Sequence, residues 1–106
     1  MDLNSMLKSL NGNNTPDETV LLVWNKAQIV PGVDPSILRK DRCGAWIKLA
    51  DYGNTNSQFC WEIDHIKPKS MGGSDDLSNL QPLQWQNNRA KSDNPIVSYC
   101  VVSARQ

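Results

Sequence analysis

The stretch that decides the fold runs from Trp61 to Asp93 and reads WEIDHIKPKSMGGSDDLSNLQPLQWQNNRAKSD. It contains the only histidine of the chain, His65, beside the carboxylate of Asp64, and two asparagines follow at Asn79 and Asn88. An imidazole that accepts a proton near neutral pH, next to oxygen atoms that suit a divalent cation, is a combination that phosphodiester hydrolysis can use.

The same stretch predicts the order strand, long loop, short strand, helix. Residues 59–66 alternate as a strand does, and residues 69–79 are rich in loop formers. Residues 80–84 predict a second strand, which Pro82 confines to an edge because proline has no N–H for the ladder. Residues 85–93 contain good helix formers and stop before an Asn-Pro pair, so they predict a helix.

The neighbours Asp64 and His65 impose a geometric condition on this outline. A regular strand sends adjacent side chains to opposite faces, with Glu62 on the Asp64 side. For Asp64 and His65 to serve one site, the backbone is therefore expected to leave regular strand geometry near His65. The helix must also bring Asn88 within metal-binding distance of Asp64.

Upstream of this stretch the sequence predicts a flexible arm over residues 1–19 and one folded domain over residues 20–106. The arm is rich in Asn, Ser, Gly and Asp, which are turn formers rather than core formers. Asp34 and Pro35 predict a short helix through residue 39 or 40. Residues 44–49 predict a strand that forms a hairpin leading into the strand at 59–66.

Size and charge narrow the possibilities further. A chain of 106 residues with 39% hydrophobic residues fits one small domain, whose four tryptophans we interpret as mainly structural. The formal net charge is zero, so any DNA binding must depend on local clusters of cations, although such clusters are often only solvated surface. The candidate DNA contacts are Arg39, Lys40, Arg42, Lys67, Lys69 and Arg89.

Cysteine usage and hydropathy bear on the compartment. Cys43, Cys60 and Cys100 form an odd set without a CxxC pair, which favours buried free thiols in a reducing environment. The longest apolar run, Val20 to Trp24, is too short to span a bilayer, and the first residues do not resemble a signal peptide. We therefore expect a cytoplasmic protein without a membrane segment.

At this point the residues resemble the HNH nucleases of the ββα-metal fold. The third motif position is Asn88 instead of histidine, which corresponds to the HNN variant of that family. The resemblance covers residues 36–94 and implies an α+β fold: a small single domain built around a ββα-metal motif, residues 59–94, with an N-terminal helical or irregular extension. The matching residues are Asp64, His65, Pro68, Gly72, Gly73, Asn79, Leu80, Asn88 and Lys91.

The resemblance implies a role for each polar residue of the motif. His65 would be the general base that activates water. Asp64 and Asn88 would hold one Mg²⁺ or Mn²⁺ through oxygen atoms. Asn79 would bond the backbone across the loop and hold His65 in its reactive tautomer, and Lys91 would offset phosphate charge.

A structural zinc ion is not expected in this chain. Many relatives carry four zinc-binding cysteines around the core, whereas Gln84 and Asn87 stand at two of those places here. Hydrophobic packing is expected to replace the metal.

The resulting prediction is a metal-dependent endonuclease, a monomer or weak dimer, that nicks duplex DNA and leaves 5′-phosphate and 3′-hydroxyl ends. Its sequence specificity is expected to be low or to come from a protein partner. Two alternatives stay open: a catalytically inactive DNA-binding module, and a protein-interaction module that retains the fold.

Overall fold

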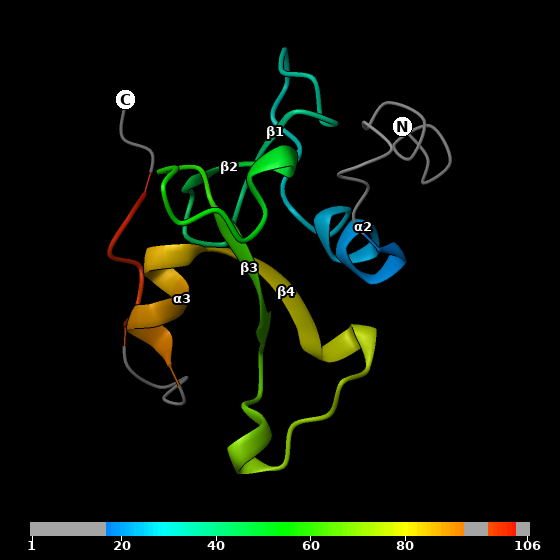
Figure 1. Cartoon of the computed structure of the whole chain (residues 1–106), viewed down its shortest axis with the longest axis vertical. Helices are drawn as coiled ribbons and strands as arrows, with labels where there is room; N and C mark the ends of the chain where they lie inside the picture. The colour runs from blue at the N-terminus through cyan, green and yellow to red at the C-terminus, as the bar shows by residue number, and fades with distance from the viewer. Residues whose placement is uncertain (1–16, 93–97, 104–106) are drawn as a thin grey trace.

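The structure is a computed structural model, and it describes residues 17–92 and 98–103 (Figure 1). Two antiparallel strand pairs and two short helices form a mixed α+β architecture, so the predicted fold class is confirmed. In chain order the elements are α2 (Glu18–Trp24), β1 (Leu38–Lys40), β2 (Trp46–Lys48), the 3₁₀ turn η2 (Leu49–Asp51), β3 (Trp61–His65), the 3₁₀ turns η3 (Lys69–Met71) and η4 (Leu77–Asn79), β4 (Leu80–Gln84) and α3 (Trp85–Lys91).

The strands β3 and β4 and the helix α3 reproduce the order that the sequence predicts. β3 pairs with β4 in an antiparallel ladder that runs from Trp61 opposite Gln84 to His65 opposite Leu80. Pro82 lies opposite Ile63 in this two-stranded sheet, where both strands are edges, as proline requires. α3 follows β4 without a linker and lies beside β3 (Figure 1).

The region before the motif differs from the prediction at two points. Residues 34–37 form a turn instead of a helix, because the Asp34 carboxylate accepts hydrogen bonds from the backbone N and the hydroxyl of Ser36. The chain then enters β1, which pairs with β2. The predicted strand at 44–49 is therefore present, but its partner is β1 and not β3.

Helix α2 begins earlier than the predicted domain boundary. The Asp17 carboxylate caps the helix by accepting from the Val20 N–H, so residues 18 and 19, assigned to the arm by the prediction, belong to α2 and residue 17 is its N-cap. The remaining arm residues, 1–16, lie outside the described residues. None of the helices within 17–92 and 98–103 is long and apolar enough to cross a membrane.

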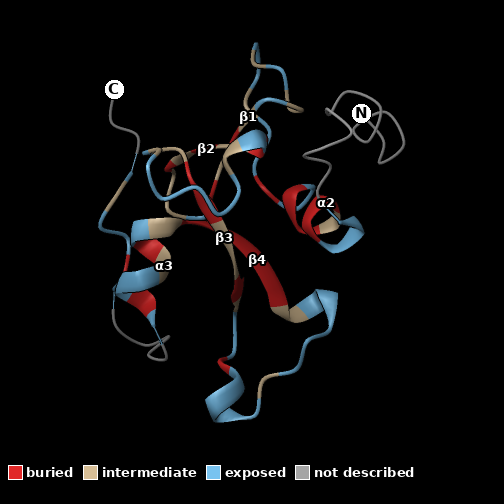
Figure 2. Ribbon diagram, viewed as in Figure 1, coloured by how far each residue is buried: buried red, intermediate tan, exposed pale blue. Residues whose placement is uncertain are grey.

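The hydrophobic core lies between α2 and the strands. α2 turns its buried face inward, as Figure 2 shows, and its Trp24 packs against Trp61 with ring centroids 5.4 Å apart. Both rings are fully buried, which agrees with the structural role predicted for them. Trp46 and Trp85 are only half-buried.

Asp41, buried just after β1, holds several segments together. Its Oδ1 accepts from the N–H groups of Cys43 and Ala45, both at 2.9 Å. Its Oδ2 accepts from the Gln84 N–H at 2.9 Å and from the Asn87 amide at 3.1 Å. A buried hydrogen-bond network therefore occupies the region of Gln84 and Asn87, and the prediction of hydrophobic packing there was wrong.

The C-terminal segment 98–103 is joined to this network. Cys100 forms a disulfide with Cys43, and the Asn87 side chain both donates to and accepts from the backbone of Val102. Cys60 is the free, buried thiol of the described residues. The prediction of free thiols was therefore wrong for Cys43 and Cys100, and the argument that it supplied for a reducing compartment is removed.

Candidate active site

A cavity of about 440 Å³ lies where β3, the loop after it and α3 meet. β3 contributes Asp64 and His65, the loop contributes Lys69, and α3 contributes Asn88 and Arg89. The predicted general base, both predicted metal ligands and two predicted DNA contacts therefore line the same cavity.

His65 is the last residue of β3 and lies outside the tryptophan core, with 29% of its side chain exposed. Its backbone remains in register opposite Leu80, so the predicted break in the strand does not occur. Asp64 and His65 nevertheless both line the cavity at the end of β3. It is bordered by the buried Asp64 and the half-exposed His65.

Asp64 is buried and accepts two hydrogen bonds. Its Oδ2 accepts from the Gln81 amide at 2.8 Å, and its Oδ1 accepts from the Lys91 ammonium at 3.1 Å. Lys91 also donates to the His65 carbonyl at 2.8 Å and is only 2% exposed. This placement argues against the predicted contact between Lys91 and phosphate, because its ammonium is occupied in tying α3 to β3.

Asn88 on α3 is oriented by Glu62, which lies on β3 two residues before Asp64. The Asn88 amide nitrogen donates to Glu62 Oε1 at 2.8 Å, which leaves Asn88 Oδ1 as the acceptor end of the amide. Arg89 donates to both Glu62 oxygens. The hydrogen bond from Arg89, with a smaller contribution from Asn88, lowers the pKa of Glu62 against the opposing effect of burial.

The donor set fits one hard divalent cation. A carboxylate has about four lone-pair sites, and Asp64 uses two of them in hydrogen bonds. Among residues 17–92 and 98–103 no group of three or more His, Cys, Asp or Glu side chains is placed to hold a metal. Carboxylate and amide oxygens are of the type that hard divalent cations bind, together with phosphate and water oxygens.

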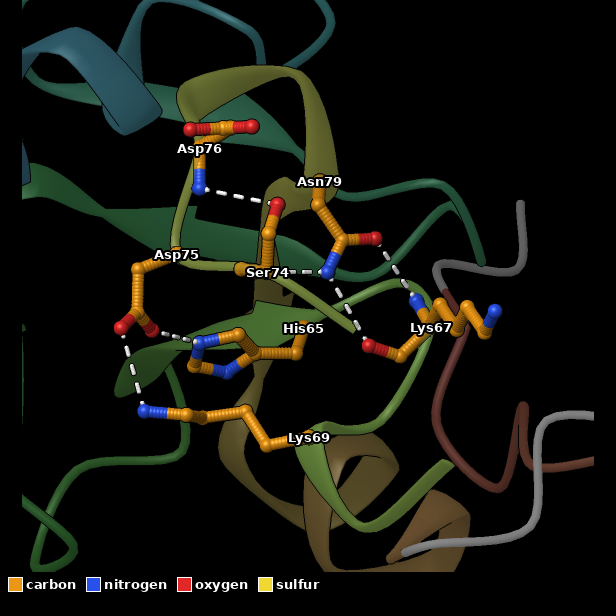
Figure 3. Close-up of polar contacts among 7 residues, drawn as sticks. All are labelled: His65, Lys67, Lys69, Ser74, Asp75, Asp76 and Asn79. Atoms are coloured by element: carbon orange, nitrogen blue, oxygen red, sulfur yellow. Dashed lines mark hydrogen bonds and ion pairs between the residues drawn. The ribbon is translucent and has the colours of Figure 1, made fainter. Parts of the chain in front are cut away.

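Asn79 closes the loop between β3 and β4, as Figure 3 shows. Its Oδ1 accepts from the Lys67 N–H at 2.9 Å, and its amide nitrogen donates to the carbonyls of Lys67 and Ser74 at 3.0 and 2.8 Å. A Cβ on Gly73 would lie 1.7 Å from the Lys67 carbonyl oxygen, so only glycine allows this closure. Asn79 thus spans the loop, but its own side chain bonds the backbone and not His65.

The His65 ring is instead contacted by Asp75, a residue that the sequence reasoning missed. His65 Nε2 lies 2.7 Å from Asp75 Oδ1, and the Lys69 ammonium lies 3.1 Å from Asp75 Oδ2 (Figure 3). The sequence did contain one sign of this contact, the acidic pair Asp75 and Asp76 in the loop that connects the histidine strand β3 to β4. Acidic residues in a Gly-Ser loop are also common turn formers, so the pattern did not distinguish the two roles.

Arg39 is buried, in contrast to its predicted role as a DNA contact. Only 3% of it is exposed, and its guanidinium donates to the carbonyl oxygens of Pro35, Asn25 and Ala27. A guanidinium engaged inside the protein is not available to a phosphate, so Arg39 is a structural residue that joins the end of α2 to β1.

The other candidate cations lie at the surface in two groups. Lys69 and Arg89 line the cavity, and Lys67 is exposed on the same loop. Lys40 and Arg42 line a second cavity of about 270 Å³. They also lie over aromatic rings, Lys40 over Trp46 and Arg42 over Tyr99.

Comparison with known proteins agrees with the resemblance seen in the sequence. A family model described as HNH endonuclease matches residues 42–94, half of the 106-residue chain. The matched span runs from the residue after Asp41 through α3 and includes the residues of the 440 Å³ cavity named above. No curated protein and no solved structure matches the chain significantly.

Proposed function

Because the chain belongs to the HNH endonuclease family, we propose that it is a metal-dependent endonuclease that hydrolyses phosphodiester bonds in DNA. Nuclease-type activity is general to the family, and its members generally use a divalent metal. The observation that supports the finer proposal is the common cavity of Asp64, His65 and Asn88. It combines a proton acceptor with two oxygen atoms of the type that bind a divalent cation.

In the proposed reaction, the neutral His65 ring removes a proton from a water molecule as the water attacks phosphorus in line with the 3′ oxygen. A divalent cation held by Asp64 and Asn88 would stabilise the negative charge of the transition state and of the leaving oxygen. Lys91 keeps Asp64 and the end of β3 in place through its two hydrogen bonds. The proposed products have 5′-phosphate and 3′-hydroxyl ends.

Substrate binding is assigned to the exposed cations at the cavity. Lys69 and Arg89 would contact the phosphates next to the scissile bond, with Lys67 reaching one further along. Lys40 and Arg42 would serve more distant phosphates from the second cavity. Phosphate contacts carry little sequence information, so the proposed cleavage has low specificity, and one site cuts one strand at a time.

The test is nicking of supercoiled plasmid in the presence of Mg²⁺, Mn²⁺ or EDTA. The wild type should convert supercoiled to open-circular DNA with either cation and stop with EDTA. His65→Ala should lower the rate by about 10²–10⁴-fold, the usual contribution of a general base. Asn88→Ala should lower it as well, whereas Asn56→Ala, at an exposed polar residue outside both cavities, should not.

Two outcomes would contradict the proposal. A wild-type chain that nicks DNA with neither cation, or a His65→Ala variant that nicks at the wild-type rate, would rule out the proposed mechanism. Retained DNA binding without cleavage would favour the inactive DNA-binding module instead.

A further inference from the structure

We propose that Asp75 is the positioning residue of His65, fixing the ring with its hydrogen on Nε2 so that Nδ1 is the atom that accepts the proton from water. This inference rests on the proposed function, because it assigns the atom of His65 that acts in the reaction. Asp75 lies in the loop between β3 and β4, outside the strands and the helix that hold Asp64, His65 and Asn88.

The contact selects one tautomer of the neutral ring. His65 Nε2 and Asp75 Oδ1 are 2.7 Å apart, a distance for a strong hydrogen bond. An ionised carboxylate only accepts hydrogen bonds, so in the neutral ring the hydrogen lies on Nε2 and the Nδ1 lone pair is free. The hydrogen bond to His65, followed by that to Lys69, lowers the pKa of Asp75, which therefore stays ionised near neutral pH.

The loop holds Asp75 in position through the two residues that precede it. The preceding residue, Ser74, is bonded through its carbonyl to the Asn79 amide. Gly73 packs so closely on the Lys67 carbonyl that a side chain would not fit. Asn79 therefore acts on His65 through the loop and Asp75, whose carboxylate is the group in contact with the ring (Figure 3).

A purely structural role does not account for this arrangement. The Asp75 side chain is 70% exposed, and the side chain of its second partner, Lys69, is 61% exposed. Exposed ion pairs contribute little to the stability of folded proteins. The constraints on the loop are therefore better explained by orientation of the His65 ring than by stabilisation of the fold.

The chain allows a direct test because His65 is its only histidine. With ¹⁵N-labelled histidine, long-range ¹H–¹⁵N spectra of the full chain report the two ring nitrogens of His65 without overlap. At a pH where the ring is neutral, the wild type should show a protonated Nε2 and an unprotonated Nδ1 with widely separated ¹⁵N shifts. Asp75→Ala should bring the two shifts closer together, because the tautomers then exchange.

Two further variants distinguish the effect of a nearby negative charge from the effect of the direct hydrogen bond between Asp75 and His65. Asp76→Ala removes the neighbouring exposed carboxylate, which does not contact the ring, and should leave both shifts unchanged. Asp75→Asn retains one acceptor oxygen and should preserve the wild-type pattern better than Asp75→Ala does. In plasmid nicking, Asp75→Ala should lower kcat by about 10–100-fold, as loss of an orienting partner does, with little change in KM.

The outcomes distinguish the inference from the proposed function. If Asp75→Ala leaves the ¹⁵N shifts and kcat as in the wild type while the wild type cleaves DNA, the role of Asp75 is wrong and the nuclease stands. If the wild type shows the fixed tautomer but cleaves nothing, the proposed function is wrong and Asp75 does not act in it.

Discussion

Two buried carboxylates in this protein have different surroundings, and the difference separates a structural region from the proposed active site. Asp41 accepts four hydrogen bonds, three from backbone N–H groups and one from Asn87. Asp64 accepts two, from Gln81 and Lys91, and borders the 440 Å³ cavity. A carboxylate offers about four acceptor sites, so Asp41 is saturated and Asp64 retains capacity for a ligand.

The residues around Asp41 are also structural, whereas those around Asp64 line the cavity. Near Asp41, the disulfide between Cys43 and Cys100 ties the C-terminal segment to the turn between β1 and β2. The hydrogen bonds between Asn87 and Val102 tie the same segment to α3. Around Asp64 the polar groups are arranged along a cavity. Replacing each carboxylate by the amide of the same shape therefore distinguishes the two roles.

The largest effect on stability is expected from Asp41→Asn. The amide nitrogen would face N–H donors where an oxygen now accepts, leaving buried donors without a partner at about 1–3 kcal/mol each. We expect the free energy of unfolding to fall by about 3–5 kcal/mol, measured by urea denaturation followed through tryptophan fluorescence. Asp76→Asn, the same change at an exposed position, is the control. A loss as small as that of the control would show that Asp41 is not structural.

The next largest effect is expected on activity, from Asp64→Asn. The amide keeps an oxygen for Lys91, and the Gln81 amide can turn its own oxygen toward the new N–H. The Lys91 ammonium nevertheless stays buried without its anionic partner, so about 3 kcal/mol of stability is lost and nicking is measured on the folded fraction. The loss of the anionic oxygen should slow plasmid nicking at least about 100-fold, or about 2.7 kcal/mol in activation free energy. Nicking near the wild-type rate would contradict the assignment of Asp64 as a ligand.

A smaller loss of stability is expected on reduction of the disulfide. Cys43 and Cys100 are 57 residues apart, so their link restricts the unfolded chain and should contribute about 2 kcal/mol or somewhat more. Dithiothreitol should lower the denaturation midpoint of the wild type but not that of Cys100→Ser, while nicking by folded protein is retained. A wild type that does not respond to dithiothreitol would show that the link is not formed.

The smallest effect on stability is expected from replacing Glu62, whose carboxylate joins β3 to α3 through hydrogen bonds from Asn88 and Arg89. The Arg89 hydrogen bond lowers its pKa below the ordinary value of 4.5. Stability from this interaction is therefore present above the ordinary pKa and is lost as the pH falls through the lowered folded value. Because Arg89 is largely exposed, the contribution to stability should be small.

The measurement for Glu62 is urea denaturation between about pH 6 and pH 3, where the difference in stability between wild type and Glu62→Gln should shrink as the pH falls. A difference that does not depend on pH would contradict the ion pair with Arg89.

The sequence predicted the ββα core well and the region before it poorly. β3, β4 and α3 are contiguous segments with their own periodicity and stop signals, so local patterns were sufficient. The helix predicted at 34–40 failed because β1 depends on pairing with β2, which local propensity does not encode. The link between Cys43 and Cys100 was missed for the same reason, since their spacing alone does not reveal proximity.

The sequence alone determined the family, the α+β core, and the candidates Asp64, His65 and Asn88, because these depend on residue identity and order within about thirty positions. Only the tertiary structure decided how each polar group is used. It buried Arg39 and Lys91, saturated Asp41, left acceptor sites on Asp64, and brought Asp75 to the His65 ring. Those outcomes depend on solvent exposure and on hydrogen bonds between distant residues, which exist only once the chain has folded.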